Sequence, residues 1–242
     1  MAPDERAVPE DIFQGIDLST NVSPREVQLI RAAINEAMRT PDPMRPGHSI
    51  GSAVTAIYAF YDYDGEPIYV GQTVEMVQTR VGRHLTGMRS DAVAKFVLDP
   101  FEVYAIAIWS IPTVEATVTG ARERARALDA YEWTVHQRLT AESAFGAVLN
   151  EGSIEPAAIM ELPEPVVAVL IPAEIFPARS HPDVRIGRRA QTIALLANRI
   201  AERKVKIGIR KALVVQTRRL NDLAQKRYEA LGGDLGDSTE ED

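Results

Sequence analysis

Two side chains that can act on a phosphate lie one helical turn apart in this sequence. Arg80 and His84 are four residues apart in a stretch with helical apolar spacing, so both should project from one helix face. A guanidinium can bind phosphate oxygens through paired N–H donors, and an imidazole can hydrogen-bond or move a proton near neutral pH. The simpler interpretation of the same pair is a solvated helix face.

A carboxylate and two tyrosines complete this set of reactive side chains. Glu132 falls between Leu128 and Val135 in the apolar stripe of a long helical segment, so it is expected to face the sheet. One glutamate can hold Mg²⁺ if water and substrate oxygens fill the other octahedral positions. Tyr58 and Tyr69 lie in two neighbouring β-rich segments. Each residue alone has a plain alternative: the tyrosines as packing residues and Glu132 turned towards water.

The elements that must position these residues follow from spacing and turn signals. Asp64 and Gly65 form a hairpin turn signal between two β-rich segments, and the pattern becomes helical after Gly71. Taken alone, Gly71 is most simply explained as a strand-to-helix turn with positive φ. The predicted helices cover about 24–38, 74–85, 113–139, 187–204 and 208–231, and the predicted strands cover 53–63, the segment from residue 67, 101–112 and 164–172. The predicted fold class is α/β (α+β), with a small antiparallel or mixed sheet flanked by helices.

Composition excludes several classes of protein. The 242 residues contain no cysteine, which rules out disulfides, thiolate zinc sites and cysteine nucleophiles. There is no apolar run long enough for a transmembrane helix, and the acidic start does not resemble a secretory signal. We therefore expect a cytoplasmic protein without a membrane partner. The expected divisions are 1–50 with one helix, 51–155 as the core, 156–231 with a strand and basic helices, and 232–242 as a disordered acidic tail.

The charge is divided unevenly along the chain. The net charge is −7, yet residues 185–227 hold 13 lysines and arginines against two acids. Such a split is compatible with a basic face for nucleic acid and equally with two solvated helices or a helical hairpin for self-association. If the cations contact phosphates, binding should weaken steeply with salt. The candidates are Arg188, Arg189, Arg199, Arg203, Lys204, Arg210, Lys211, Arg218 and Arg219.

Five features in order resemble the GIY-YIG nucleases. The segments 56–58 (Ala-Ile-Tyr) and 69–71 (Tyr-Val-Gly) resemble the two strand motifs of that family. Arg80 and His84 resemble the following helix, and their spacing is typical of the restriction-endonuclease branch. Glu132 resembles the metal-binding glutamate, and Asn150 resembles the asparagine after that helix. The resemblance covers about residues 53–150, including the β-β-α-β-α order.

The resemblance implies an endonuclease that cleaves DNA with Mg²⁺ or Mn²⁺. In that interpretation Tyr58 positions or activates the attacking water, Glu132 binds the metal and Arg80 stabilises the pentacovalent phosphate. Tyr69 and His84 orient the phosphate and the nucleophile, and Asn150 steadies a neighbour or a backbone loop. Arg83 is a further phosphate contact. A restriction or phage-defence role is favoured over a repair or mobile-element nuclease, and cutting both strands is compatible with a homodimer or with sequential nicking.

Some positions depart from the family pattern and keep other functions open. Ala56 replaces the usual glycine, Val70 replaces isoleucine, and Gln72 stands where many members have lysine. The approach to Asn150 lacks the usual proline. The alternatives are a nucleic-acid-binding or assembly protein with an inactive GIY-YIG fold, and a nuclease that cleaves RNA.

Overall fold

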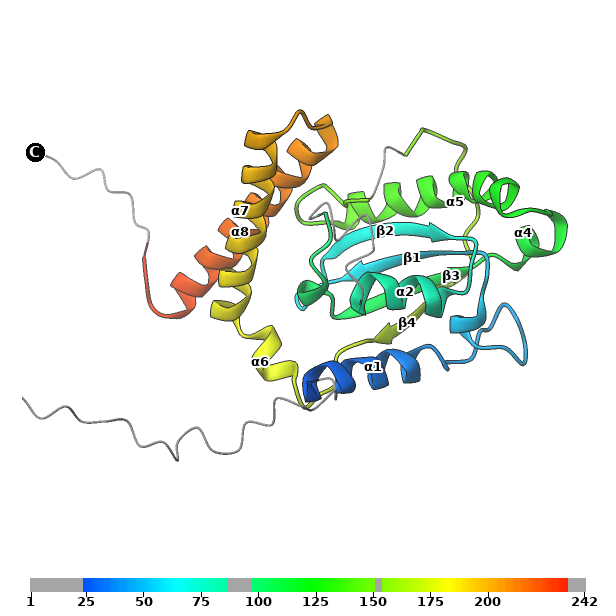
Figure 1. The fold of residues 1–242 in the computed structure, drawn as a ribbon, viewed down its shortest axis with the longest axis horizontal. Helices are drawn as coiled ribbons and strands as arrows, with labels where there is room; N and C mark the ends of the chain where they lie inside the picture. Colours follow the sequence, from blue (N-terminus) through cyan, green and yellow to red (C-terminus); the bar gives the residue numbers. More distant parts are fainter. Residues whose placement is uncertain (1–23, 87–96, 151–153, 235–242) are drawn as a thin grey trace, which may run out of the picture.

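A four-stranded antiparallel sheet forms the centre of the structure (Figure 1). The computed structural model describes residues 24–86, 97–150 and 154–234. The strands, in the spatial order β2-β1-β3-β4, are β2 (Pro67–Thr73), β1 (Ala56–Tyr61), β3 (Ala105–Ser110) and β4 (Val166–Val169). Each neighbouring pair is antiparallel, and β3 is an inner strand with all its residues buried, as its apolar sequence predicts. The mixed α/β class and the small sheet are thus confirmed.

The expectations for the ends of the chain fall largely outside the described residues. Residues 1–23 lie outside them, as does most of the predicted acidic tail, from residue 235 onward.

The turn at Asp64 and Gly65 sets the register of the first hairpin. Gly65 has φ 76°, and the backbone N–H groups of Asp64 and Glu66 donate to Asp62 Oδ1 at 2.9 and 3.0 Å. In the resulting register Tyr58 lies directly opposite Gly71. Because β2 continues to Thr73, Gly71 lies inside a strand and is not among the positive-φ glycines, so its expected turn conformation is wrong.

Seven α-helices surround the sheet within the described part of the chain. They are α1 (Arg25–Ala37), α2 (Val77–Thr86), α4 (Pro112–Thr117), α5 (Ala121–Glu142), α6 (Phe176–Ser180), α7 (Pro182–Glu202) and α8 (Ile207–Ala230). The single helix expected over 113–139 is instead two, because Gly120 takes φ 89°, which is incompatible with a continuous helix. The short α6 was not predicted. No described helix is long and apolar enough to cross a membrane.

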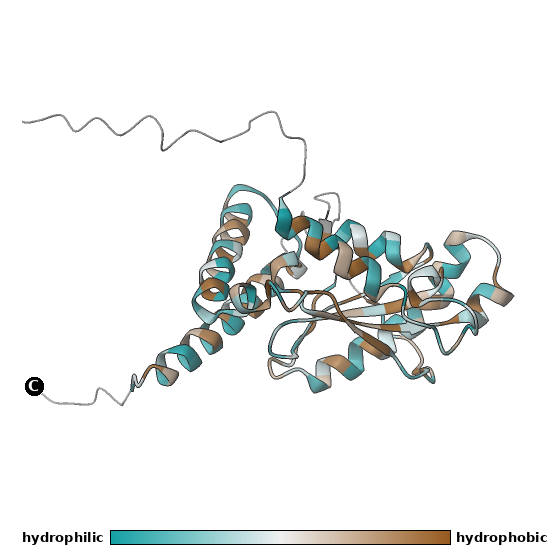
Figure 2. Ribbon diagram, turned by 90° about the horizontal axis from the view of Figure 1, so that it is seen from below, coloured by the Kyte–Doolittle hydropathy of each residue, from teal (hydrophilic) through white to brown (hydrophobic). Residues whose placement is uncertain are grey.

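Alternate residues of β1 contribute to two separate cores. Tyr58 and Phe60 share one core with α2, whereas Ile57 and Ala59 share the other with α5. The helices α2 and α5 therefore cover opposite faces of the sheet, and the strands carry the most apolar colouring (Figure 2). This division fixes which face each candidate catalytic residue can reach.

The α7–α8 hairpin stands across one end of the sheet and is attached by buried charges (Figure 1). Arg189 donates to Asp62 Oδ2 and Glu102 Oε2, each at 2.9 Å, and Arg185 donates to Asp64 at 2.8 and 3.0 Å. We call Asp62, Glu102, Arg185 and Arg189 the buried ion-pair cluster, and Asp64, which pairs with Arg185, is exposed. Burial opposes the charge on Arg185, but Asp64 and Glu102 outweigh it and raise its pKa. For Asp62, burial is dominant and raises the pKa despite Arg189 and Arg185.

Candidate active site

The hydroxyl of Tyr58 lies between two of the predicted catalytic side chains. Its Oη is 2.7 Å from His84 Nε2 and accepts a hydrogen bond from Arg80 Nε at 3.1 Å. Because the guanidinium can only donate, the phenol proton can be donated in turn to the imidazole. Tyr58 and His84 are 0% and 1% exposed, so these bonds form out of contact with bulk water. The four-residue spacing on α2 thus places both side chains on one tyrosine.

The electrostatic surroundings keep His84 neutral. Burial, together with the positive charges of Arg80 and Arg83, lowers the pKa of His84 from 6.5 to about 3. Arg83 itself is exposed and forms an ion pair with Glu75. The imidazole is therefore neutral near pH 7 in this structure and serves as a hydrogen-bonding group.

The lowered pKa of His84 predicts a loss of stability in mild acid. The unfolded chain binds this proton near pH 6.5 and the folded chain only near pH 3, so stability falls as pH drops through that window. Between pH 7 and 5 the free energy of unfolding should fall by about 2 kcal/mol because of this group. Urea unfolding at the two pH values measures the loss, and His84→Gln should remove the share due to His84 while the share due to His136, whose pKa is also lowered, remains. His48→Gln removes an exposed imidazole and should retain the wild-type loss; equal slopes in all three proteins would contradict the assignment.

Tyr69 joins the same cluster through ring contacts. Its ring centroid lies 6.2 Å from that of Tyr58 and 5.4 Å from that of His84, and its side chain is almost fully buried. Gly71 makes the arrangement possible, since a Cβ at that position would lie 2.7 Å from Tyr58 Oη. The glycine is thus required by the close approach of a side chain from the neighbouring strand. Four of the predicted residues, Tyr58, Tyr69, Arg80 and His84, are therefore brought together.

Glu132 approaches from the other face of the sheet. It is half-buried on α5, whose apolar residues pack on the face of the sheet opposite the one that carries Tyr58. The helix α5 contacts β2, the strand next to that of Tyr58, because Gln72 Nε2 donates to Asp129 Oδ1 at 2.8 Å. Asp129 precedes Glu132 by about one turn. Glu132 and Tyr58 therefore lie on the two sides of β2, which is an edge strand.

Asn150 lies at the exposed edge of that strand. The preceding residue, Leu149, pairs with Tyr69 in a parallel bridge, and its carbonyl accepts from Val70 N at 3.0 Å. Parallel pairing carries Asn150 along β2 in the direction of Gly71. The predicted residues thus gather around one short stretch of β2, with Tyr58 on one side, Glu132 on the other and Asn150 along the edge.

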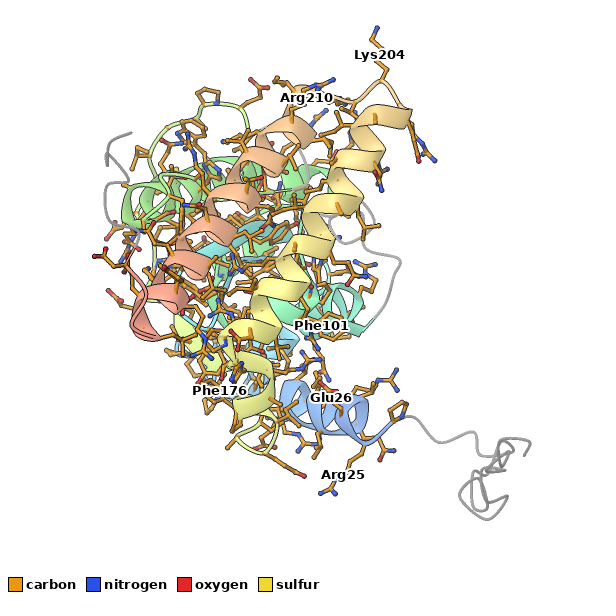
Figure 3. All side chains as sticks on the ribbon, turned by 90° about the vertical axis from the view of Figure 1, so that its left-hand side faces the viewer. Arg25, Glu26, Phe101, Phe176, Lys204 and Arg210 are labelled. Atoms are coloured by element: carbon orange, nitrogen blue, oxygen red, sulfur yellow. The ribbon has the colours of Figure 1, made fainter. Side chains whose placement is uncertain are left out.

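The predicted phosphate-binding cations divide into buried and exposed groups. Arg189 and Arg219 are 4% and 2% exposed and donate hydrogen bonds to carboxylate or carbonyl oxygens. Neither can contact a phosphate at the surface, so the prediction that they bind phosphate is wrong. Arg188 is half-buried, with its guanidinium 4.1 Å from the ring centroid of Phe101. The exposed group lies mainly where α7 meets α8, and Figure 3 shows Lys204 and Arg210 at this tip. The exposed members are Arg203, Lys204, Arg210, Lys211 and Arg218, and Arg199 is partly exposed.

A cleft of about 950 Å³ separates the hairpin tip from α5. The tip contributes Arg203, Lys204 and Lys211, and the opposite wall contains Trp133 and Asn150. None of the described residues that line the cleft is acidic. Sequence analysis gave no role to Trp133, although its position directly after Glu132 could have indicated that it lies near the same site.

Comparisons with known proteins leave the chain's family open. No protein-family model matches it, nor does any curated protein or solved structure. A functional conclusion must therefore rest on the fold and on the cluster of Tyr58, Arg80 and His84.

Proposed function

We propose that the protein is a metal-dependent endonuclease of GIY-YIG type that hydrolyses DNA phosphodiester bonds, with restriction or phage defence as its role. The observation that carries this proposal is the Tyr58 hydroxyl held between Arg80 Nε and His84 Nε2. A phenol oxygen that accepts from a guanidinium and donates its hydrogen bond to a neutral imidazole is suited to orient a water. The tip of the α7–α8 hairpin lines the cleft beside Asn150, and its positive charge supports a polyanionic substrate.

Each residue has a defined task in the proposed reaction. Tyr58 positions the attacking water, while His84 holds the phenol in place as a neutral acceptor of its hydrogen bond. Arg80 stabilises negative charge on the phenol oxygen and on the phosphate as the bond breaks. Tyr69 packs against both rings and fixes their orientation. Asn150 lies at the edge where the scissile strand would pass.

The metal in this proposal is Mg²⁺ or Mn²⁺, with Glu132 as its protein ligand. No group of three or more possible metal-ligating side chains occurs within the described ranges. A single carboxylate is nevertheless compatible with Mg²⁺, which keeps several waters and takes further oxygens from a phosphate. Glu132 is only half-buried and belongs to the helix that lines the cleft, which leaves room for such a shell. The ion would supply positive charge to the phosphate.

The direct test is cleavage of plasmid and phage DNA by the full chain. Wild-type protein is expected to cut with Mg²⁺ or Mn²⁺ and not in EDTA, and Glu132→Ala is expected to bind DNA without cutting. Discrete fragments would support a restriction enzyme. A labelled RNA of the same sequence, incubated in parallel, distinguishes the RNA-cleaving alternative. Absence of cutting with either metal on either substrate would contradict the proposed activity.

One observation favours a second candidate, a nucleic-acid-binding protein without catalysis. The polar groups of Tyr58 and His84 are enclosed in the core, as they would be in a purely structural cluster. In that case the same assays would show binding that weakens with salt but no metal-dependent cutting.

A further inference from the structure

The cleft between the hairpin tip and α5 combines positive charge with an aromatic ring. Arg199, Arg203, Lys204, Lys206 and Lys211 line one side, and Trp133 of α5 lines the other. Bases of single-stranded nucleic acids commonly stack on aromatic side chains while nearby cations bind the phosphates. The walls of this cleft therefore present both kinds of group that one nucleotide requires.

The N-terminus of α8 adds backbone donors to the cationic wall. This 24-residue helix begins at Ile207, and Ile207, Gly208 and Ile209 all line the cleft. No side chain caps its first turn, and that turn contains no acidic residue. The first N–H groups of a long helix favour an anion such as a phosphate.

His136 supplies a polar group on the α5 wall, one turn after Glu132. Its Nε2 is 3.3 Å from the carbonyl oxygen of Val148, which requires the ring proton on that nitrogen. Burial, and then Lys211, lower the pKa of His136, so the ring stays neutral. Its Nδ1 is then a buried acceptor with no hydrogen-bond partner in the structure as described.

We propose that this cleft holds one unpaired nucleotide of the substrate strand, with its phosphate at the start of α8 and its base against Trp133. The inference rests on the proposed function, because it names the form of nucleic acid that the nuclease engages beside Asn150. The size of the cleft decides against a duplex as its occupant. A volume of about 950 Å³ accommodates a nucleotide, whereas a double helix is far too wide to enter. The substrate strand must therefore be unpaired at this position, either before binding or by extrusion of one base.

The sequence offers a built-in spectroscopic probe of this cleft. Of the two tryptophans, Trp109 is 1% exposed in the core beneath α5, and Trp133 lines the cleft. Titration of the full chain in EDTA with a short single strand should therefore quench Trp133 fluorescence. A blunt duplex of the same sequence should quench it much less. Equal quenching by both, or none by the single strand at saturation, would contradict the proposal.

Affinities measured by anisotropy of labelled oligonucleotides in EDTA give the second readout. Trp133→Ala should weaken single-strand binding by about tenfold to a hundredfold and duplex binding little. Trp133→Phe should retain part of the single-strand affinity, which controls for a folding defect, and thermal melting checks both variants. Tyr228→Ala removes an exposed aromatic ring elsewhere on α8 and should change neither affinity. Lys206→Gln combined with Lys211→Gln should weaken binding and its salt dependence, whereas Lys226→Gln at the other end of α8 should not.

The outcomes separate this inference from the nuclease proposal. If the protein cuts DNA but Trp133→Ala binds single strands as wild type does, the nucleotide pocket is wrong and the nuclease stands. If the protein never cuts but loses single-strand affinity in Trp133→Ala, the pocket stands and the catalytic proposal fails.

Discussion

Removal of one oxygen atom by the Tyr58→Phe substitution is expected to reduce DNA cleavage by at least about a hundredfold. The phenol oxygen is the atom on which Arg80 and His84 converge, and the aromatic ring packs in the same way without it. DNA affinity should change little, because Tyr58 is fully buried and contributes no surface contact. The measurement is single-turnover cleavage at saturating enzyme, with DNA binding measured separately in EDTA.

A matched substitution on the same strand controls for packing. Tyr61→Phe removes the same atom from a half-buried tyrosine that packs with the α5 core, and it should cut like wild type. Tyr58→Phe also leaves a buried imidazole nitrogen without its partner, so a loss of about 1–3 kcal/mol in unfolding free energy is expected. Cleavage must therefore be assayed at a temperature where both variants are folded. Wild-type rates in folded Tyr58→Phe would rule out the proposed role of the hydroxyl.

The Arg189→Met substitution is expected to lower the free energy of unfolding by about 3–5 kcal/mol. Methionine fills much of the same space but leaves the buried Asp62 and Glu102 carboxylates without one of their cations. Burial already raises the pKa of Asp62 despite its two arginines. Loss of Arg189 should therefore destabilise the charged carboxylate further at neutral pH. Denaturant unfolding at pH 7 measures the change.

A double substitution tests whether unpaired buried carboxylates cause the loss of stability in Arg189→Met. Arg189→Met combined with Glu102→Gln should be more stable than the sum of the two single losses predicts, because the second change removes one unpaired charge. Arg218→Met, which alters an exposed arginine on α8, should stay within about 0.5 kcal/mol of wild type. A loss below about 1 kcal/mol in Arg189→Met would show that the cluster contributes little.

Local patterns were enough to predict the sheet and most helices. They failed at Gly120, where the φ angle of one residue ends one helix and starts another. The Asp64–Gly65 turn predicts the first hairpin, but the register shift between Phe60 and Tyr61, which sets the pairing of Tyr58 with Gly71, has no signal in the sequence. The break at Gly120 was missed because the apolar stripe continues on both sides of it. An isolated glycine within a helical pattern does not disclose its φ.

The sequence predicts which residues of the candidate site share a helix face, but not which face of the sheet each helix covers. Helical spacing correctly placed Arg80 and His84 together, since that relation is local. The apolar stripe showed that Glu132 faces the sheet, but it could not show which face α5 covers. Arg189 resembled a surface cation because its partners lie 87 and 127 residues away in the chain. Single-sequence reasoning has no access to pairings over such distances.

Arg219 has a consequence for how the chain matures during synthesis. Its guanidinium donates to the carbonyls of Pro67 and Ala147 at 3.0 and 3.1 Å and lies 3.5 Å from Glu66. The earliest hairpin of the sheet is thus completed by a side chain that leaves the ribosome only after residue 219. Until then, the carboxylate of Glu66 lacks its counter-charge, just as the buried ion-pair cluster lacks its cations until Arg185 and Arg189 are synthesised, and the nascent core should remain incompletely folded. Truncation before α7 should therefore yield an insoluble or protease-sensitive fragment rather than a minimal nuclease.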